Sequence, residues 1–420
     1  MKITVIGLGY IGLPTAAMFA KSGFDVIGYD INPKVIEALN QGRIIIEEPG
    51  LGELVKEVVS TGKLKGDTKI NESDVFIIAV PTPINEDKTA NMEYVKTAVE
   101  SIVKYLRKDN TVILESTSPP GTIDDIVLPI LNKSGLNMGE EVFVAYSPER
   151  VLPGKIIQEL EENDRVIGGI NEKSAEKVKE IYSAFVKGHI YTTDSKTAEM
   201  CKLMENTYRD VNIALANELA ITCEELGINA WEVIELSNKH PRVNIHQPGP
   251  GVGGHCLAVD PWFIVEKQKN GVIIEKSREI NDNMPIHVFN RLKHILKDDN
   301  SKIGILGITY KPNIDDTRES PILKLADIIL KNTNYKLALH DPYVLKNNTR
   351  FKDYMVNSIE EAAENADILI LGVNHREYGN IDFEKISKLM KFKHIYDTRN
   401  FLDEKTLEEL GFKITLLGRG

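Results

Sequence analysis

The feature that most constrains the fold of this chain is a glycine-rich turn close to its first residue. A short apolar run, Ile3–Ile6, leads into Gly7-Leu8-Gly9-Tyr10-Ile11-Gly12, and a helical pattern follows from about Leu13 to Lys21. A second apolar run, Asp25–Tyr29, then ends at Asp30. A strand, a glycine turn, a helix and a second strand with an acidic end form the unit that binds dinucleotides. We therefore expect a doubly wound, mostly parallel α/β domain here.

Each glycine of the turn has its own physical reason. Gly7 permits the tight turn, Gly9 lets a pyrophosphate approach the backbone, and Gly12 lets the helix pack closely on the strand. The free N–H groups at the helix start would receive the phosphates. Asp30 is expected to bind the ribose hydroxyls, and Asn32-Pro33 offers no arginine for a 2′-phosphate. The pattern predicts NAD rather than NADP, with a ligand-free glycine turn as the alternative.

Further apolar runs of the same domain end in polar residues. Thr82, Thr117 and Glu149 each follow such a run. Ligands of open parallel sheets gather at the carboxyl ends of the strands, so these three side chains are expected to face cofactor and substrate. Ordinary turn or capping roles are the alternative for each of them. The runs are 75–80, 111–114 and 142–145.

Length, charge and cysteine usage exclude several classes of protein. A chain of 420 residues is expected to form two or three domains. A net charge of −11 argues against nucleic acid as the main ligand. No apolar run is long enough to span a bilayer, and the first residues enter a strand at once, without a signal peptide. Three cysteines without metal-type spacing predict no metal site, no disulfide framework and a cytoplasmic location.

The middle of the chain predicts one long helix. Residues Thr197–Leu226 contain neither Gly nor Pro, and Gly227 is a typical C-terminal signal. Such a helix spans roughly 45 Å, long enough to leave the first domain and contact a partner chain, so a homodimer or a homotetramer is expected. Lys202, Asn206 and Arg209 recur at spacings of three and four and share a face. That face either lines a site or is simply solvated.

A glycine-rich loop that carries one cysteine follows this helix. Gly249, Gly251, Gly253 and Gly254 precede Cys256, and Asp260 follows four residues later. Glycines remove side-chain bulk where a ligand comes close, and a thiolate can attack a carbonyl carbon. Cys256 is therefore a candidate nucleophile, and a turn-rich loop with a packed cysteine is the alternative. His240 and Arg242, just before the loop, could bind an anion or form an exposed basic turn.

The last third begins a second α/β unit at Lys302–Gly307. It lacks a Gly-x-Gly-x-x-Gly pattern, so no second dinucleotide is assigned, while Lys311 and Arg318 suit a diphosphate or carboxylate. The predicted fold class is α/β, with two Rossmann-like doubly wound domains joined by the long central helix and a helical middle domain. A further helical region, about Asp260–Leu296, is expected to complete this middle domain. The expected domain boundaries are 1–195, 196–298 and 299–420.

Taken together, these residues resemble the UDP-glucose/GDP-mannose dehydrogenase family over the whole chain. The motifs that carry the resemblance are Val5–Gly12, Ala79–Pro83, Glu115–Pro119, Pro148–Arg150 and Gly249–Pro261. Other stretches resemble the branch of the family that oxidises UDP-N-acetyl-D-mannosamine at C6. They are Glu149–Gly154, Thr197–Leu203, His240–Ile245 and Cys256–Phe263. Ala258 and Trp262 replace the Pro and Tyr common in other branches, which argues against UDP-glucose.

The resemblance implies an NAD-dependent four-electron oxidation of the C6 hydroxyl of a UDP-sugar to a carboxylate. Cys256 would add to the aldehyde, Lys202 and Asn206 would stabilise the oxyanion, and Thr117, Glu149 and Asp260 would handle water and protons. An unperturbed thiol is only a few per cent thiolate at pH 7, so the Lys202 ammonium would also favour the thiolate. By resemblance, the cofactor site also includes Tyr10, Ile11 and Arg318. The substrate set is Arg150, Val151, Lys202, Asn206, Arg209, His240, Arg242, Gly253, Tyr310, Lys311 and Arg399.

Three alternatives stay open. One is a 6-dehydrogenase that acts on the gluco epimer, UDP-N-acetyl-glucosamine, in place of the manno epimer. A two-electron hydroxyacid dehydrogenase would use Lys202 and Asn206 with a structural Cys256. A sugar-nucleotide-binding protein would have lost the chemistry altogether.

Overall fold

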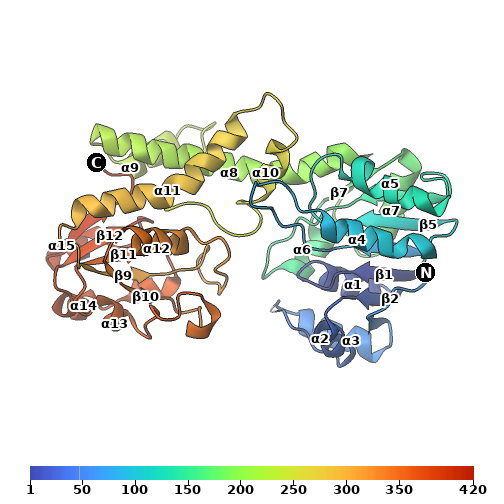
Figure 1. The fold of residues 1–420 in the computed structure, drawn as a ribbon, viewed down its shortest axis with the longest axis horizontal. Coiled ribbons are helices and arrows are strands. Elements are labelled where there is room, and N and C mark those ends of the chain that lie inside the picture. Colours follow the sequence, from blue (N-terminus) through green and yellow to red (C-terminus); the bar gives the residue numbers. More distant parts are fainter. Residues whose placement is uncertain (47) are drawn as a thin grey trace. The chain divides into compact units, whose positions relative to one another are not determined.

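The computed structural model describes residues 1–46 and 48–420, which form two compact units (Figure 1). Unit 1 comprises Met1–Glu205 and Trp262–Lys269, and unit 2 comprises Asn206–Pro261 and Asn270–Gly420. No helix among the described residues is both long and apolar enough to cross a membrane.

Unit 1 is built on an eight-stranded sheet in the order β3-β2-β1-β4-β5-β6-β7-β8. All neighbours pair in parallel except β6 and β7, which are antiparallel. The chain crosses from β1 outward to β3 and then back past β1 to β4, which is the doubly wound order. The strands are β1 Lys2–Ile6, β2 Asp25–Tyr29, β3 Leu64–Asp67, β4 Val75–Ile78, β5 Asn110–Leu114, β6 Val142–Tyr146, β7 Arg165–Gly169 and β8 Ile190–Asp194.

Two separate apolar clusters show that both faces of this sheet are covered. One contains Phe19, Val55 and Tyr182 from α1, α3 and α7, and the other contains Val99 and Leu131 from α4 and α5. Strands buried on both faces read as continuous apolar runs, which is why the sequence shows them so clearly. The helices are α1 Gly12–Lys21, α2 Pro33–Asn40, α3 Leu51–Ser60, α4 Glu93–Ile102, α5 Leu128–Leu131, α6 Ile156–Glu162 and α7 Glu172–Tyr182, with short turns at Val103–Tyr105, Ile123–Val127 and Asn132–Ser134.

Unit 2 contains a five-stranded, fully parallel sheet in the order β10-β9-β11-β12-β13. Ile303, Ile305 and Ile370 of this sheet pack with residues of α11 and α12, while Leu369 and Ile395 pack with α14 and α15. The strands are β9 Lys302–Leu306, β10 Lys336–His340, β11 Ile368–Leu371, β12 His394–Asp397 and β13 Lys413–Leu416. The helices are α9 Ala230–Ser237, α11 Ile273–Ile295, α12 Pro321–Asn332, α13 Ile359–Ala363, α14 Phe383–Leu389 and α15 Glu404–Glu409, with short turns at Lys346–Asn348 and Arg376–Asn380.

The long central helix, α8, runs from Ser195 to Leu226. It ends where Gly227 adopts a left-handed conformation with φ +71°, which a glycine reaches without strain. The predicted fold class is confirmed: a mostly parallel and a fully parallel sheet, a long helix and a helical middle region are present.

The helical region expected near 260–296 consists of two helices. The first is α10, Asp260–Val265, and the second is α11, which starts at Ile273. The segment between them contains Asn270-Gly271, a pair typical of a turn, so the helix ends before it. The edge strands β3 and β13 were not predicted. Each is only four residues long and contains one lysine, so neither forms a continuous apolar run in the sequence.

Candidate active site

The turn between β1 and α1 has the shape that a dinucleotide site needs. Gly7 has φ +92°, and a Cβ atom added to it would lie 2.5 Å from the carbonyl oxygen of Ala79. A Cβ atom on Gly12 would lie 1.9 Å from the carbonyl oxygen of Gly7. A Cβ atom on Gly9, in contrast, would meet open space. Two glycines are thus required by the fold, while Gly9 leaves its backbone open to a ligand.

The start of α1 is electrostatically prepared for an anion. In the part of the chain that the structure describes, no side chain caps this helix and its first turn holds no acidic residue. The carboxylate of Asp30 accepts hydrogen bonds from the N–H of Leu8 at 3.0 Å and of Asn32 at 2.8 Å. Asp30 is thereby fixed beside the glycine turn. The uncapped N-terminus of α1 is suited to bind a pyrophosphate. NAD fits these residues.

The residues predicted at the strand ends follow three adjacent strands. Thr82 comes after β4, Thr117 after β5 and Glu149 after β6, and these strands are neighbours in the sheet. Ser116 links the first two loops, because its hydroxyl accepts the Val80 N–H at 2.9 Å and donates to the Val80 carbonyl at 2.8 Å. The three predicted residues therefore follow the carboxyl ends of three adjacent parallel strands in the sheet of unit 1.

A buried carboxylate fixes the loop that carries Thr117. Glu199, on the first turns of α8, accepts hydrogen bonds from the N–H groups of Gly121 at 2.5 Å and Ile123 at 2.9 Å. Burial raises the pKa of Glu199 to about 7. The helix that carries Lys202 is thus bonded directly to the Thr117 loop.

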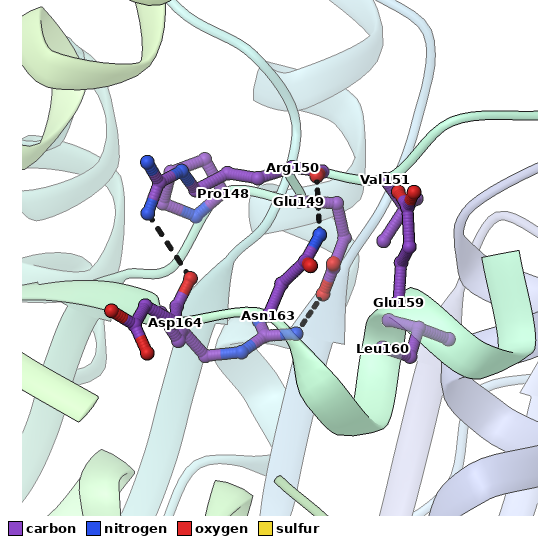
Figure 2. Close-up of a pocket in the computed structure, with 9 residues that line it drawn as sticks. Pro148, Glu149, Arg150, Val151, Glu159, Leu160, Asn163 and Asp164 are labelled. Atoms are coloured by element: carbon purple, nitrogen blue, oxygen red, sulfur yellow. Dashed lines mark hydrogen bonds and ion pairs between the residues drawn. The ribbon is translucent and has the colours of Figure 1, made fainter. Parts of the chain in front are cut away.

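Glu149 lines a pocket of unit 1 (Figure 2). Its carboxylate is ion-paired with Arg165, and only 7% of the residue is exposed. Arg150 is held by an ion pair to Glu205 at 2.7 Å and by a hydrogen bond to the Asp164 carbonyl at 3.1 Å. The lining residues are Pro148, Glu149, Arg150, Val151, Glu159, Leu160, Asn163, Asp164 and Arg165.

In unit 2, the structure brings together three of the predicted catalytic residues. Asn206 donates a hydrogen bond from Nδ2 to Oδ2 of Asp260 at 2.6 Å, and Asp260 is 4% exposed. The N–H of Asp260 in turn bonds the Cys256 carbonyl at 2.8 Å. Cys256 is a half-buried, unbridged thiol. Hydrogen bonds thus join the Asn206 amide, the Asp260 carboxylate and the backbone of the loop that carries the Cys256 thiol.

The glycines of the cysteine loop are explained by a close contact with the loop after β9. A Cβ atom on Gly253 would lie 2.7 Å from Cβ of Tyr310, and one on Gly254 would lie 2.8 Å from the Tyr310 ring. The N–H of Gly254 bonds the Arg318 carbonyl at 3.1 Å. Only residues without side chains allow this approach, so the cysteine loop and the loop that carries Tyr310 and Lys311 form one surface.

A buried polar network holds both ends of the cysteine loop. The N–H of Gly249 donates to Asn217 at 2.9 Å, and Asn217 donates to Asn281 at 2.8 Å. Asn281 bonds the Asp210 carboxylate at 2.8 Å, and the same carboxylate is paired with Arg278 at 2.5 Å. Arg278 also reaches the Leu257 carbonyl at 3.5 Å. The network therefore bonds the cysteine loop at Gly249, before Cys256, and at Leu257, directly after it.

The loop that carries Lys311 rests on a buried histidine. The Nδ1 atom of His375 accepts the N–H of Asn313 at 2.9 Å, and its Nε2 atom lies 3.0 Å from Asp341. Because Nδ1 accepts a backbone N–H, the proton sits on Nε2 and points to the carboxylate. The His375–Asp341 pair therefore holds the predicted nucleotide-binding loop through the N–H of Asn313.

The remaining predicted residues are placed as follows. Arg209 is exposed on α8, and His240 and Arg242 lie on an exposed turn after α9. Arg318 pairs with Asp316 at 2.6 Å. Arg399 donates to the Gly372 carbonyl at 3.0 Å and packs on Gly249. The roles of the predicted site residues in binding and catalysis stay predictions.

Several residues of these clusters were missed by sequence reasoning. Arg165 opens an apolar strand, and Arg278 lies on an amphipathic helix, where charged residues usually face solvent. His375 follows a strand end, and that position was the only available signal for it. The others missed in this way are Glu115, Tyr182, Glu199, Asn217, Asn281 and Asp341.

Three domain models of one protein family match consecutive segments of the chain. Residues 1–186 match the NAD binding domain of the UDP-glucose/GDP-mannose dehydrogenase family, residues 196–283 its central domain, and residues 304–404 its UDP binding domain.

Individual relatives and solved structures cover the whole chain. A UDP-N-acetyl-D-mannosamine dehydrogenase of Methanocaldococcus jannaschii is 52% identical over 100% of this chain and 97% of its own. The solved structure of the Pyrococcus horikoshii UDP-N-acetyl-D-mannosamine dehydrogenase covers 100% of both chains at 43% identity, with a TM-score of 0.92. A UDP-N-acetyl-mannosamine dehydrogenase structure from Staphylococcus aureus gives a TM-score of 0.89 at 46% identity over 100% of this chain and 99% of that chain. The chain therefore belongs to the UDP-glucose/GDP-mannose dehydrogenase family and is an NAD-dependent UDP-sugar dehydrogenase.

Proposed function

We propose that the enzyme oxidises the C6 hydroxyl of UDP-N-acetyl-D-mannosamine to the carboxylate of UDP-N-acetyl-D-mannosaminuronate, with Cys256 as covalent nucleophile. The observation that carries the proposal is the Cys256–Asp260–Asn206 group on a loop clamped at both ends. The Gly7–Gly12 turn and Asp30 would hold NAD⁺, which would supply the hydride acceptor for both oxidations. The relatives named above act, by their names, on UDP-N-acetyl-mannosamine, which supports the choice of sugar.

In the first oxidation, the enzyme has to position the C6 hydroxyl and remove its proton. Lys202 and Asn206 are proposed to stabilise the oxygen as it gains negative charge. The UDP moiety would be held by Tyr310 and Lys311, on the loop that His375 and Asp341 support. Binding energy from this remote group would align C6 for hydride loss.

In the second oxidation, the Cys256 sulfur is proposed to add to the aldehyde carbon. The new C–S bond gives a tetrahedral thiohemiacetal whose oxygen Lys202 and Asn206 again stabilise, and loss of hydride then leaves a thioester. Water attacks the thioester carbon, the C–S bond breaks, and the proton from water passes by way of Glu149 or Asp260 toward the leaving sulfur. Thr117 is proposed to hold this water.

The substrate choice is tested by NADH release with a panel of UDP-sugars. We expect kcat/KM for UDP-N-acetyl-D-mannosamine to exceed that for UDP-glucose by at least about tenfold, because a site shaped for an acetamido group leaves polar atoms unpaired without it. UDP-N-acetyl-glucosamine is the close rival, and a faster reaction with it would move the proposal to the gluco epimer. An enzyme that prefers UDP-glucose to both would show the branch to be wrong.

We further propose that the enzyme forms a homodimer or a homotetramer, and that α8 makes the contact between chains. We also propose a cytoplasmic location, which agrees with its three unbridged thiols. Met200, Met204, Tyr208 and Leu215 are exposed by 36%, 42%, 57% and 53%, and their spacing puts them on one side of this helix. Apolar surface of this kind is typical of a contact between chains.

Light scattering at micromolar concentration should give at least twice the mass of one chain. Tyr208→Asp with Leu215→Asp should shift the protein toward the monomer, because two charges would be buried in the contact. Leu345→Asp, at a residue that is 70% exposed outside α8, is the matched control and should leave the mass unchanged. A monomeric wild type would remove this part of the proposal.

A further inference from the structure

Behind Glu149 lies a buried cluster of charged groups that the proposed chemistry does not use. Arg165, the first residue of β7, is paired with Glu149 and donates to the Ser147 hydroxyl at 3.1 Å. The same guanidinium lies 3.9 Å from the Glu115 carboxylate and 4.1 Å from the centre of the Tyr182 ring. The exposed fractions of the Arg165, Glu149 and Glu115 side chains are 5%, 5% and 0%.

The cluster holds two carboxyl groups and a single guanidinium. An unpaired buried charge is unfavourable, so one of the two carboxyls should be neutral. Glu115 is the more deeply buried and lies farther from the guanidinium, and it bonds the hydroxyls of Tyr182 and Thr15. Burial raises the pKa of Glu115 to about 8, and the charge of Glu149 adds to the shift. The raised pKa favours the neutral form of Glu115, which leaves the guanidinium of Arg165 to pair with the Glu149 carboxylate.

We propose that Arg165 is the positioning residue of Glu149, and that its guanidinium, which also lies against Glu115 and the Tyr182 ring, keeps the Glu149 carboxylate ionised and oriented. This inference rests on the role proposed for Glu149 in hydrolysis. A buried carboxylate can accept a proton from water only if it is ionised beforehand, and burial by itself opposes ionisation. Its guanidinium partner removes that penalty.

The antiparallel pairing of β6 with β7 explains how the partner arrives. Ala145 lies opposite Gly169 and Tyr146 opposite Gly168, so the start of β7 runs alongside the segment after β6. Arg165 thereby comes to lie beneath Glu149, sixteen positions away in sequence. The charged and titratable groups around Glu149 are Glu115, Arg150, Glu159, Asp164, Arg165 and Tyr182.

The test is the pH profile of uronate formation by the holoenzyme. Arg165→Met should lower kcat by about 10²-fold, the scale of a general base, and should move the low-pH limb upward by about one unit or more. KM for the UDP-sugar and for NAD⁺ should stay within a few-fold. Arg165→Lys should recover part of kcat and bring the limb back, and it carries the test if Arg165→Met does not fold. Arg107→Met, at an exposed arginine of the same unit, is the matched control and should match wild type.

A second readout tests the neutral state of Glu115. Its pKa is higher in the folded than in the unfolded chain, so its protonation contributes stability that declines as pH rises from about 4.5 to about 8. Glu115→Gln has no such proton to lose. Between these pH values, the unfolding equilibrium constant of the wild type should therefore rise relative to that of the variant by up to about tenfold per pH unit. Equal slopes would overturn the charge assignment.

The remaining outcomes separate the inference from the proposed function. If Arg165→Met loses activity while its low-pH limb stays at the wild-type position, Arg165 has a structural role only and the inference is wrong. If Glu149→Gln retains uronate production, the role of Glu149 itself fails. If Glu149→Gln loses activity but Arg165→Met keeps it, the role of Glu149 stands and Arg165 does not position it.

Discussion

Replacing Cys256 with alanine should nearly abolish uronate formation, by at least about 10³-fold, while binding of the UDP-sugar and NAD⁺ remains. The first hydride transfer needs a base and a well-placed C6 hydroxyl, neither of which the sulfur supplies. The second needs a tetrahedral carbon that can expel hydride, and an aldehyde provides one only after a nucleophile has added. The wild type should therefore release two NADH per uronate, measured by absorbance against product quantified chromatographically.

The reverse reaction separates the two oxidations. Cys256→Ala should still reduce added aldehyde with NADH, because this step does not require a C–S bond. Cys201→Ala is the matched control, because Cys201 is an exposed thiol on α8 outside the hydrogen-bonded group around Cys256. One NADH per turnover in the wild type, or near-normal uronate production by Cys256→Ala, would contradict the covalent mechanism. The two-electron hydroxyacid dehydrogenase would then be the better description.

Much of the fold could be predicted from local sequence. The glycine turn at Gly7–Gly12 and the apolar strands that follow it are local patterns, because strands buried on both faces need a continuous apolar run. The end of α8 at Gly227 was likewise predictable from a single residue. The short edge strands β3 and β13 were not, since edge strands need less apolar surface and carry lysines. The two domain boundaries, at 195 and 298, stay predictions.

The candidate site could be predicted only as far as its motifs. Cys256 and Asp260 lie four residues apart, and Asn206 was recognised from its spacing on a predicted helix and from family resemblance. Their supporting residues come from distant parts of the chain. Arg278 bonds a residue 68 positions away, and its place on an amphipathic helix predicts a solvated side chain. Arg278 is instead fully buried against Asp210, and the local sequence around Arg278 contains no signal for this contact.

The second large effect is expected at this buried pair. Arg278 and Asp210 both have fully buried side chains, with the guanidinium 2.5 Å from the carboxylate. Arg278→Met would leave Asp210 buried without a cation, so the free energy of unfolding should fall by about 3–5 kcal/mol. Asp210→Asn with Arg278→Met removes both charges and should recover most of that loss. Urea denaturation measures both variants.

A surface pair on the same helix provides the control. Lys276 is paired with Glu279 at 2.7 Å, but both side chains are largely exposed, so Lys276→Met should leave the free energy of unfolding nearly unchanged. A loss as large as that of Arg278→Met would mean that substitution anywhere on α11 is harmful, and the buried pair would have no special part.

The pH dependence of the Arg278→Met deficit identifies its cause. Burial already raises the pKa of Asp210 against the opposing pull of Arg278, and without that cation the pKa should rise further. As pH falls, the folded variant then binds a proton that the unfolded chain does not, so its stability increases. The deficit should be larger at pH 8 than at pH 5, and equal deficits would point to lost packing. Because Arg278 also contacts the Leu257 carbonyl, the folded variant should lose kcat for uronate more than NAD⁺ affinity, as expected if the network sets the position of Cys256.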